Sequence, residues 1–271
     1  MDEALLEKAA SIYLGRAKKA FELAREKISE AALGGSLELD LSDMELCEIP
    51  QELFKLEKLE KLNLDENKIA YIPDEIGNLK NLRHLSIRGN GIMNLPDSIG
   101  LLANLEKLYL GYNTISELPD SICNLQNLKM LNLASNLLTM LPENIGCLKS
   151  LSKFSLHDNI LEFLPNSMGN LKSLVKLFLD NNSLNAVPVA LSALDNLEEL
   201  VISGNELKSI PAEFSGFNRL KELILDENQL KTLPASLAKC ASLRLIALNG
   251  NPVESIPQEL LNRANLTIDI N

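Results

Sequence analysis

The sequence predicts an α/β solenoid: a curved stack of repeats with one parallel β-sheet on its concave face and short helical or 3₁₀ turns on its convex face. Three observations predict this fold. Leucine and isoleucine recur in a fixed frame, as in residues 59–73 (LEKLNLDENKIAYIP), and an asparagine recurs every 23 residues from Asn67 to Asn251. Ten of the 11 prolines share one column of the repeat, from Pro50 to Pro257. A fixed period of this length is the signature of a repeat architecture.

Residues 1–35 precede the repeats and are predicted to form an amphipathic helical cap. Apolar residues recur at three- and four-residue steps, among them Leu5, Phe21, Ile28 and Ala32, until Gly34 and Gly35 stop the helix. The first repeat of a solenoid would otherwise expose its core, so a covering element is expected there. Six basic and six acidic residues on this helix argue against docking on an anionic membrane.

Residues 36–271 are predicted to form ten repeats and a terminal strand. The segment before each asparagine is a short strand whose two leucine-type residues, at repeat positions four and six, point inward. The asparagine amide donates and accepts hydrogen bonds, so it can satisfy backbone groups of two successive turns. The proline fixes its backbone torsion and starts the convex turn. The first repeat has Met44 in the asparagine column, as expected of an end repeat.

The last residues depart from the period. Ile268 and Ile270 alternate one residue out of register with the earlier strands. This pattern predicts a final short strand that closes the stack imperfectly. It leaves open whether that edge is tolerated, pairs with another molecule or is continued by further chain. A monomer is favoured.

Composition excludes several classes of partner. The formal net charge is −11, which argues against nucleic acid and against anionic membranes because both are polyanions. No apolar run approaches the roughly 20 residues of a membrane span, and the acidic N-terminal sequence lacks the pattern of a signal peptide. Because none of the four cysteines lies beyond the outermost repeats, they are interpreted as reduced thiols of a cytoplasmic protein.

Residues 36–271 resemble the intracellular leucine-rich-repeat proteins with the 23-residue unit LxxLxLxxNxLxxLPxxIxxLxx, the Ras-group type also seen in bacterial effectors. The resemblance implies a non-enzymatic interaction module, a signalling scaffold that binds a protein partner through its concave face. In some members that partner is a small GTPase or a phosphatase. The alternative is a secreted bacterial effector acting in host cytosol, or the recognition arm of a larger enzyme such as a ubiquitin ligase or kinase. A longer reading frame would favour this alternative.

Partner specificity is expected to come only from the outward positions of the strands, because the frame residues are committed to structure. The outward positions change character along the stack: acidic in the first two repeats, basic and aromatic in the middle, and apolar with acidic residues in the last third. The predicted partner-binding residues are His84, Arg88, Lys107, Tyr109, Tyr112, Met130, Lys153, His157, Lys176, Phe178, Val201, Glu222 and Ile224.

The apolar run of Phe178, Val201 and Ile224 has two interpretations. Such residues suit any exposed parallel sheet, but their contiguity and charged flanks favour a contact patch. Catalysis has no support in the sequence. His84 and His157 lie three strands apart, about 14 Å at the usual spacing, so they cannot share a metal ion. No cofactor, metal or catalytic residue is predicted.

Overall fold

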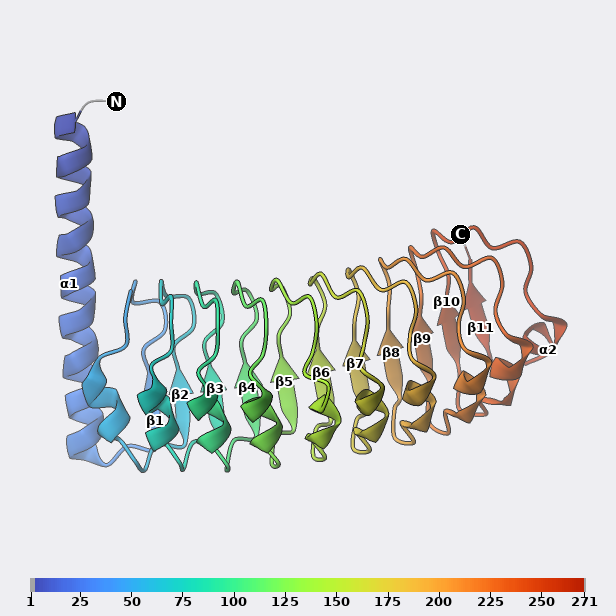
Figure 1. The fold of residues 1–271 in the computed structure, drawn as a ribbon, viewed down its shortest axis with the longest axis horizontal. Helices are drawn as coiled ribbons and strands as arrows, with labels where there is room; N and C mark the ends of the chain where they lie inside the picture. Colours follow the sequence, from blue (N-terminus) through green and yellow to red (C-terminus); the bar gives the residue numbers. More distant parts are fainter. Residues whose placement is uncertain (1–2, 271) are drawn as a thin grey trace.

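Each 23-residue unit forms one coil and places a three-residue strand beside the strand of the preceding coil. The structure, a computed structural model, describes residues 3–270, with side chains described from Leu14 onward. Within this range 11 strands form one sheet in sequence order (Figure 1). They are β1 (Glu38–Asp40), β2 (Lys61–Asn63), β3 (His84–Ser86), β4 (Lys107–Tyr109), β5 (Met130–Asn132), β6 (Lys153–Ser155), β7 (Lys176–Phe178), β8 (Glu199–Val201), β9 (Glu222–Ile224), β10 (Leu245–Ala247) and β11 (Thr267–Asp269).

Short 3₁₀ turns form the opposite side of the stack, as predicted. They are η1 (Gln51–Lys55), η2 (Asp74–Asn78), η3 (Asp97–Leu101), η4 (Asp120–Asn124), η5 (Ile145–Cys147), η6 (Asn166–Asn170), η7 (Val189–Ala193), η8 (Ala212–Gly216) and η9 (Ala235–Lys239). All except η5 begin immediately after the column proline. Pro73, for example, has φ −65°, and its missing N–H costs nothing at the first position of a turn.

The asparagine column joins successive coils through buried hydrogen bonds. Nδ2 of Asn159 donates to the carbonyls of Leu133, Leu156 and His157 at 3.0–3.2 Å, and its Oδ1 accepts from the amide of Leu138 at 3.0 Å. Two of these partners belong to the preceding coil. The predicted bridging role of the asparagine is therefore confirmed.

The first coil lacks its own asparagine and depends on the next one. The amides of Met44 and Leu46 both donate to Oδ1 of Asn67, at 3.1 and 3.0 Å. The loss of the column asparagine at Met44 therefore leaves these two amides satisfied. An asparagine at position 44 would also have donated to carbonyls of its own coil, as Asn159 does. One of these carbonyls, that of Leu41, accepts instead from Nδ2 of Asn67 at 2.9 Å.

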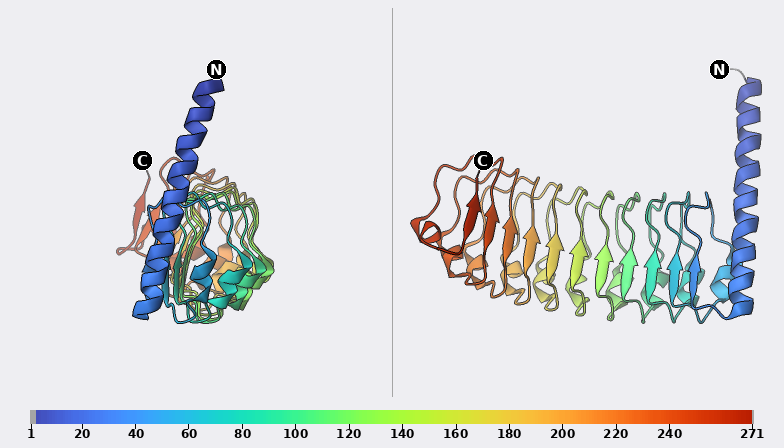
Figure 2. Two further views of the ribbon diagram at one scale, coloured as in Figure 1. Left: turned by 90° about the vertical axis from the view of Figure 1, so that its left-hand side faces the viewer. Right: turned by 180° about the vertical axis from the view of Figure 1, so that it is seen from behind.

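Helix α1 (Glu3–Gly34) stands against the first coil, and its N-terminal half extends past the edge of the stack (Figures 1 and 2). Ala20, Ala24 and Ile28 are buried in the common core. The predicted stripe differs in detail, because Ala32 is exposed and Phe21 is half-buried. The side chain of Leu5, also in that stripe, lies outside the described side chains. In the described range no helix is long and apolar enough for a membrane span.

The far end of the stack has the predicted register slip. β11 pairs with β10 as Leu245↔Thr267 and Ile246↔Ile268, a shift of 22 residues where the other pairs shift by 23. This slide places Ile268 on the inward side, where it packs partly buried against the core. The single-turn helix α2 (Gln258–Leu261) precedes β11 on the convex side.

Candidate functional site on the concave face

The exposed surface of the sheet, called the concave face below, is built from two rows of side chains. The middle residue of each strand points into the core, and the residues on either side of it point out. Register pairing aligns equivalent residues on adjacent strands, so each row is continuous. The first row is Glu38, Lys61, His84, Lys107, Met130, Lys153, Lys176, Glu199, Glu222 and Leu245. The second row is Asp40, Asn63, Ser86, Tyr109, Asn132, Ser155, Phe178, Val201, Ile224 and Ala247.

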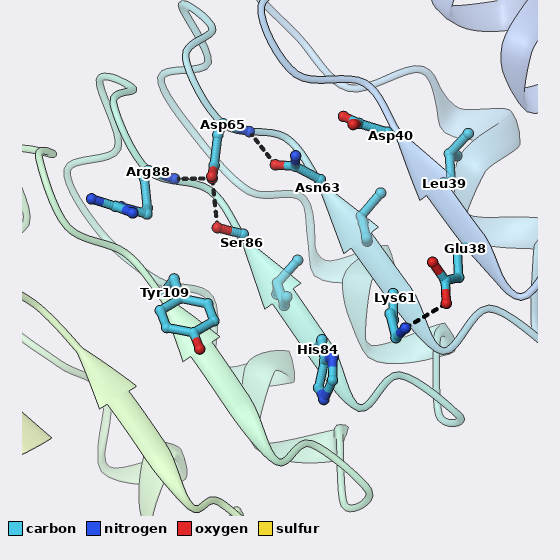
Figure 3. Close-up of a pocket in the computed structure, with 12 residues that line it drawn as sticks. Glu38, Leu39, Asp40, Lys61, Asn63, Asp65, His84, Ser86, Arg88 and Tyr109 are labelled. Atoms are coloured by element: carbon cyan, nitrogen blue, oxygen red, sulfur yellow. Dashed lines mark hydrogen bonds and ion pairs between the residues drawn. The ribbon is translucent and has the colours of Figure 1, made fainter. Parts of the chain in front are cut away.

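The concave face is hollowed over its first four strands, with a cavity volume of about 490 Å³ (Figure 3). Its polar lining includes three of the predicted residues, His84, Arg88 and Tyr109. Lys61 and Ser86 also line the hollow but were not predicted as site residues. Their place in the two rows is the signal that could have identified them.

Polar groups in this hollow already have partners within the protein. Oδ1 of Asp65 accepts hydrogen bonds from Oγ of Ser86 at 2.6 Å and from the amide of Arg88 at 2.7 Å. Lys61 forms an ion pair with Glu38. Hydrogen bonds from the side chain and amide of Ser42 lower the pKa of Asp40, so this carboxyl is ionised at neutral pH. The hollow is therefore a preorganised, mixed-charge surface.

His84 lies between Lys61 and Lys107 in the first row. Desolvation by burial is the largest cause that lowers its pKa below the usual 6.5, and the positive charges of Lys107 and Lys61 add to it. His84 is therefore neutral at pH 7. Because the unfolded chain binds this proton more tightly, the contribution of His84 to stability is complete above the unfolded pKa. It is lost as pH falls below that value and through the lower folded pKa.

A ¹H NMR titration should show the pKa of His84 below that of the same residue in urea-unfolded protein, about 6.5. Lys107→Ala removes a cation beside the imidazole, so it should move the folded value upward. Lys172→Ala, which removes a lysine paired with Asp195 several coils away, is the control and should leave the folded pKa of His84 unchanged. A folded pKa at or above the unfolded one would contradict this assignment.

The lysines of the first row fall into two classes. Lys176 forms an ion pair with Glu199 at 2.6 Å, just as Lys61 pairs with Glu38. Among the described residues, neither Lys107 nor Lys153 forms an ion pair. Lys153 and Lys176 are both predicted partner-binding residues, but they differ because Glu199 neutralises Lys176.

Two of the cations contact aromatic rings. Nζ of Lys153 lies 5.3 Å from the ring centroid of Phe178, and the guanidinium of Arg88 lies 5.8 Å from that of Tyr112. Both distances are within the range of a cation–π attraction. The Lys153 contact makes the basic middle of the face continuous with the apolar residues that follow it.

The apolar ridge, defined as Phe178, Val201 and Ile224, lies on three adjacent strands. The registers Phe178↔Val201 and Val201↔Ile224 align the three side chains, and each is half-buried. The ridge ends there, because the next residue in the row, Ala247, is buried. Glu222 lies beside it in the first row, paired in register with Glu199.

The remaining predicted residues are distributed along the same face. Oη of Tyr109 lies 3.6 Å from Sδ of Met130 on the next strand. His157 lies close to Asp180, and burial raises the pKa of this carboxyl above its usual value. His84 and His157 belong to strands or strand ends three coils apart. Within the described residues, no group of three or more His, Cys, Asp or Glu side chains could hold a metal ion.

A second apolar surface lies outside the concave face, on the loops between the asparagine and proline columns. Leu137, Met140, Ile160 and Phe163, from two successive coils, are each about half exposed. The expectation that only the strands carry variable surface is therefore incomplete. Apolar residues at non-frame positions of neighbouring repeats were the signal for this edge.

Comparisons with known proteins agree with this architecture. A family model described as "Leucine-rich repeat region" matches residues 74–174, and one described as "Leucine rich repeat" matches residues 38–92 and 195–253. The comparison with curated proteins gives no match.

Several solved structures are similar. A leucine-rich-repeat protein of Leptospira interrogans is 29% identical with a TM-score of 0.67, and the alignment covers 90% of this chain and 81% of that one. The plant peptide hormone receptor RGFR1 in complex with RGF2 is 33% identical with a TM-score of 0.67, over 89% of this chain and 45% of that one. The PEPR1–AtPEP1 structure is 30% identical with a TM-score of 0.75, over 86% and 35%. This chain thus spans less than half the length of the last two.

Proposed function

The chain is a leucine-rich-repeat protein, and from this premise we propose that it is a non-enzymatic interaction module that binds a protein partner through its concave face. The observation that carries the proposal is the apolar ridge, three aligned and half-buried side chains bordered by charged residues. An apolar centre inside a polar rim is the usual anatomy of a protein interface. The similar structure of RGFR1 in complex with RGF2 supports a binding role.

The rest of the concave face fits binding better than catalysis. Its ion pairs and hydrogen bonds hold side chains in place across adjacent strands, as Lys176–Glu199 and Ser86–Asp65 do. A preorganised surface loses less side-chain entropy when a partner docks. Its titratable groups are dispersed along a broad sheet, whereas catalysis needs them to converge on one reacting atom.

A signalling scaffold in the cytoplasm is the setting that we propose for this module. Burial raises the pKa of the Cys123 thiol to about 11, with smaller contributions from Cys147 and Asp120. A thiol of this kind is unreactive at neutral pH and serves packing. Such cysteines are compatible with a reducing compartment.

The double variant Phe178→Ala/Ile224→Glu should abolish capture of the partner from lysate. The first change removes the largest apolar contact, and the second places a charge where the interface would be desolvated. Loss of a central aromatic residue alone commonly weakens binding by about 2 kcal/mol or more, roughly thirtyfold. Quantitative mass spectrometry of affinity-captured proteins would measure the loss.

The control is Phe163→Ala/Ile160→Glu, which makes the same residue changes at more exposed positions on the loop edge, away from the concave face. A partner that binds the concave face should be captured by this control as by the wild type. Equal capture by both double variants and the wild type would contradict the proposal. Circular dichroism would verify that each variant is folded.

A further inference from the structure

We propose that the concave face binds an extended protein segment, with acidic side chains over Lys107 and Lys153 and apolar side chains over the ridge of Phe178, Val201 and Ile224. This inference rests on the proposed function. It adds the chemistry of the bound segment, the spacing between its acidic and apolar residues, and the order of these two parts along the sheet.

The charge of the first row argues for the acidic part. Glutamates on neighbouring strands pair with the outer lysines Lys61 and Lys176, whereas no ion pair within the described residues involves the inner lysines Lys107 and Lys153. Met130 lies between them in the row, so the strands that carry the two lysines, β4 and β6, lie about 10 Å apart. In a chain of net charge −11, this local excess of positive charge complements an acidic partner.

The groups beside these lysines do not cancel their positive charge. His84, beside Lys107, is neutral at pH 7 and contributes no charge of its own. Arg88 lies on the same side of the face and contacts the ring of Tyr112. The centre of the face therefore presents three cations, Arg88, Lys107 and Lys153, to a ligand.

The apolar part of the segment is inferred because the basic centre of the concave face adjoins the apolar ridge. The ammonium of Lys153 lies over the ring of Phe178, the first residue of the ridge. A segment that reaches Lys153 therefore already lies at the edge of Phe178. Val201 and Ile224 extend the apolar contact over the next two strands.

The strand spacing sets the separation between the two parts of the ligand. The midpoint of Lys107 and Lys153 lies on β5, and the centre of the ridge lies on β8. Three strand spacings of about 4.8 Å make about 14 Å, and an extended chain advances about 3.4 Å per residue. Acidic and apolar residues of the segment should therefore be about four residues apart.

Acidic residues at both ends of this surface fix which part of the bound segment lies toward which strands. Glu222 lies beside the far end of the ridge and, within the described residues, forms no ion pair. Asp40 and Asp65 line the hollow at the other end. Like charges at these positions disfavour a wrong placement, so the acidic residues should lie toward β4–β6 and the apolar ones toward β9.

Selection from a phage-displayed library of random 16-residue peptides tests the inference, with full-length protein as bait. Wild-type bait should enrich peptides with Asp or Glu about four residues from an aromatic or aliphatic group. Lys107→Glu/Lys153→Glu should enrich Lys or Arg in place of the acidic residues. Lys129→Glu alters a lysine outside both rows and should select the same peptides as the wild type.

Synthetic versions of the selected peptides distinguish a failure of this inference from a failure of the proposed function. The best wild-type peptide should bind Lys107→Glu/Lys153→Glu at least tenfold more weakly by fluorescence anisotropy. It should also lose affinity as NaCl is raised, because salt screens exposed charges. Peptides without acidic enrichment, or with unchanged affinity for this variant, would overturn the inference while leaving the proposed function intact. Peptides that also bind Phe178→Ala/Ile224→Glu unchanged would overturn both.

Discussion

Asn159→Leu should lower the free energy of unfolding by about 3–5 kcal/mol. Asn159 is 6% exposed, and its amide makes four hydrogen bonds to backbone groups of two coils. Leucine has a similar volume but cannot donate or accept, so buried backbone groups lose their partners at about 1–3 kcal/mol each. Relaxation of the backbone keeps the total below the simple sum. Urea unfolding followed by circular dichroism would measure the change.

Asn127→Leu provides the matched control. Asn127 is exposed, and its side chain makes one hydrogen bond, from Nδ2 to the carbonyl of Ala103 at 2.9 Å. Water can replace that bond, so the loss should stay below about 1 kcal/mol. If the two substitutions cost the same, the asparagine column would not be what joins the coils.

These asparagines also show why so much of the fold could be predicted from the sequence. The asparagines from Asn67 to Asn251 have equivalent neighbours, because each regular coil repeats the geometry of the coil before it. The inward leucines, the column proline and the alignment of Phe178 with Val201 follow from the same 23-residue period. Even the slip at Ile268 was visible as a departure from that period.

Features that break the period could not be read in this way. Glu199 neutralises Lys176 while Lys153 contacts Phe178, a difference set by side-chain rotamers across strands. Periodicity predicted helix α1, but it could not predict how much of the helix packs against the first coil. A helix of 32 residues is about 48 Å long, and among its described side chains those buried in the core, Ala20, Ala24 and Ile28, lie in its later turns.

The candidate site was predicted in outline for the same reason. Ten of the 13 predicted residues belong to the two rows that the period defines. Arg88, Tyr112 and His157 lie just after their strands at fixed repeat positions, so the exposure of all 13 was expected from the repeat. The hollow at Lys61 and Ser86 depends on the sizes of neighbouring side chains. The exposed edge residues Ile160 and Phe163 lie in loops, where the frame places no constraint on their orientation.

Gly146→Ala should destabilise the protein by about 2–4 kcal/mol. A β-carbon at this position would lie 1.9 Å from the carbonyl oxygen of Ser167 in the next coil, and backbone atoms cannot move aside as a flexible side chain can. Overpacking of this kind typically costs about 1–3 kcal/mol, and more where the backbone must shift. Urea unfolding measures the loss. Gly15→Ala in α1 is the control: a β-carbon there meets nothing within 4 Å, so stability should rise by up to about 1 kcal/mol.

Cys123 shows how the stack accommodates a side chain in the column of Gly146. Its Sγ donates to the backbone and side-chain oxygens of Asn144 at 3.4 and 3.2 Å. The turn of that next coil, η5, begins only at Ile145, whereas the other turns begin directly after the proline.

Gly146→Ala should disturb the following turn, η6, in the same way. Hydrogen exchange should accelerate at Asn166–Asn170 and remain unchanged two coils away, because each coil packs only on its neighbours. Unchanged exchange in η6 together with unchanged stability would show that the close approach at Gly146 imposes no constraint.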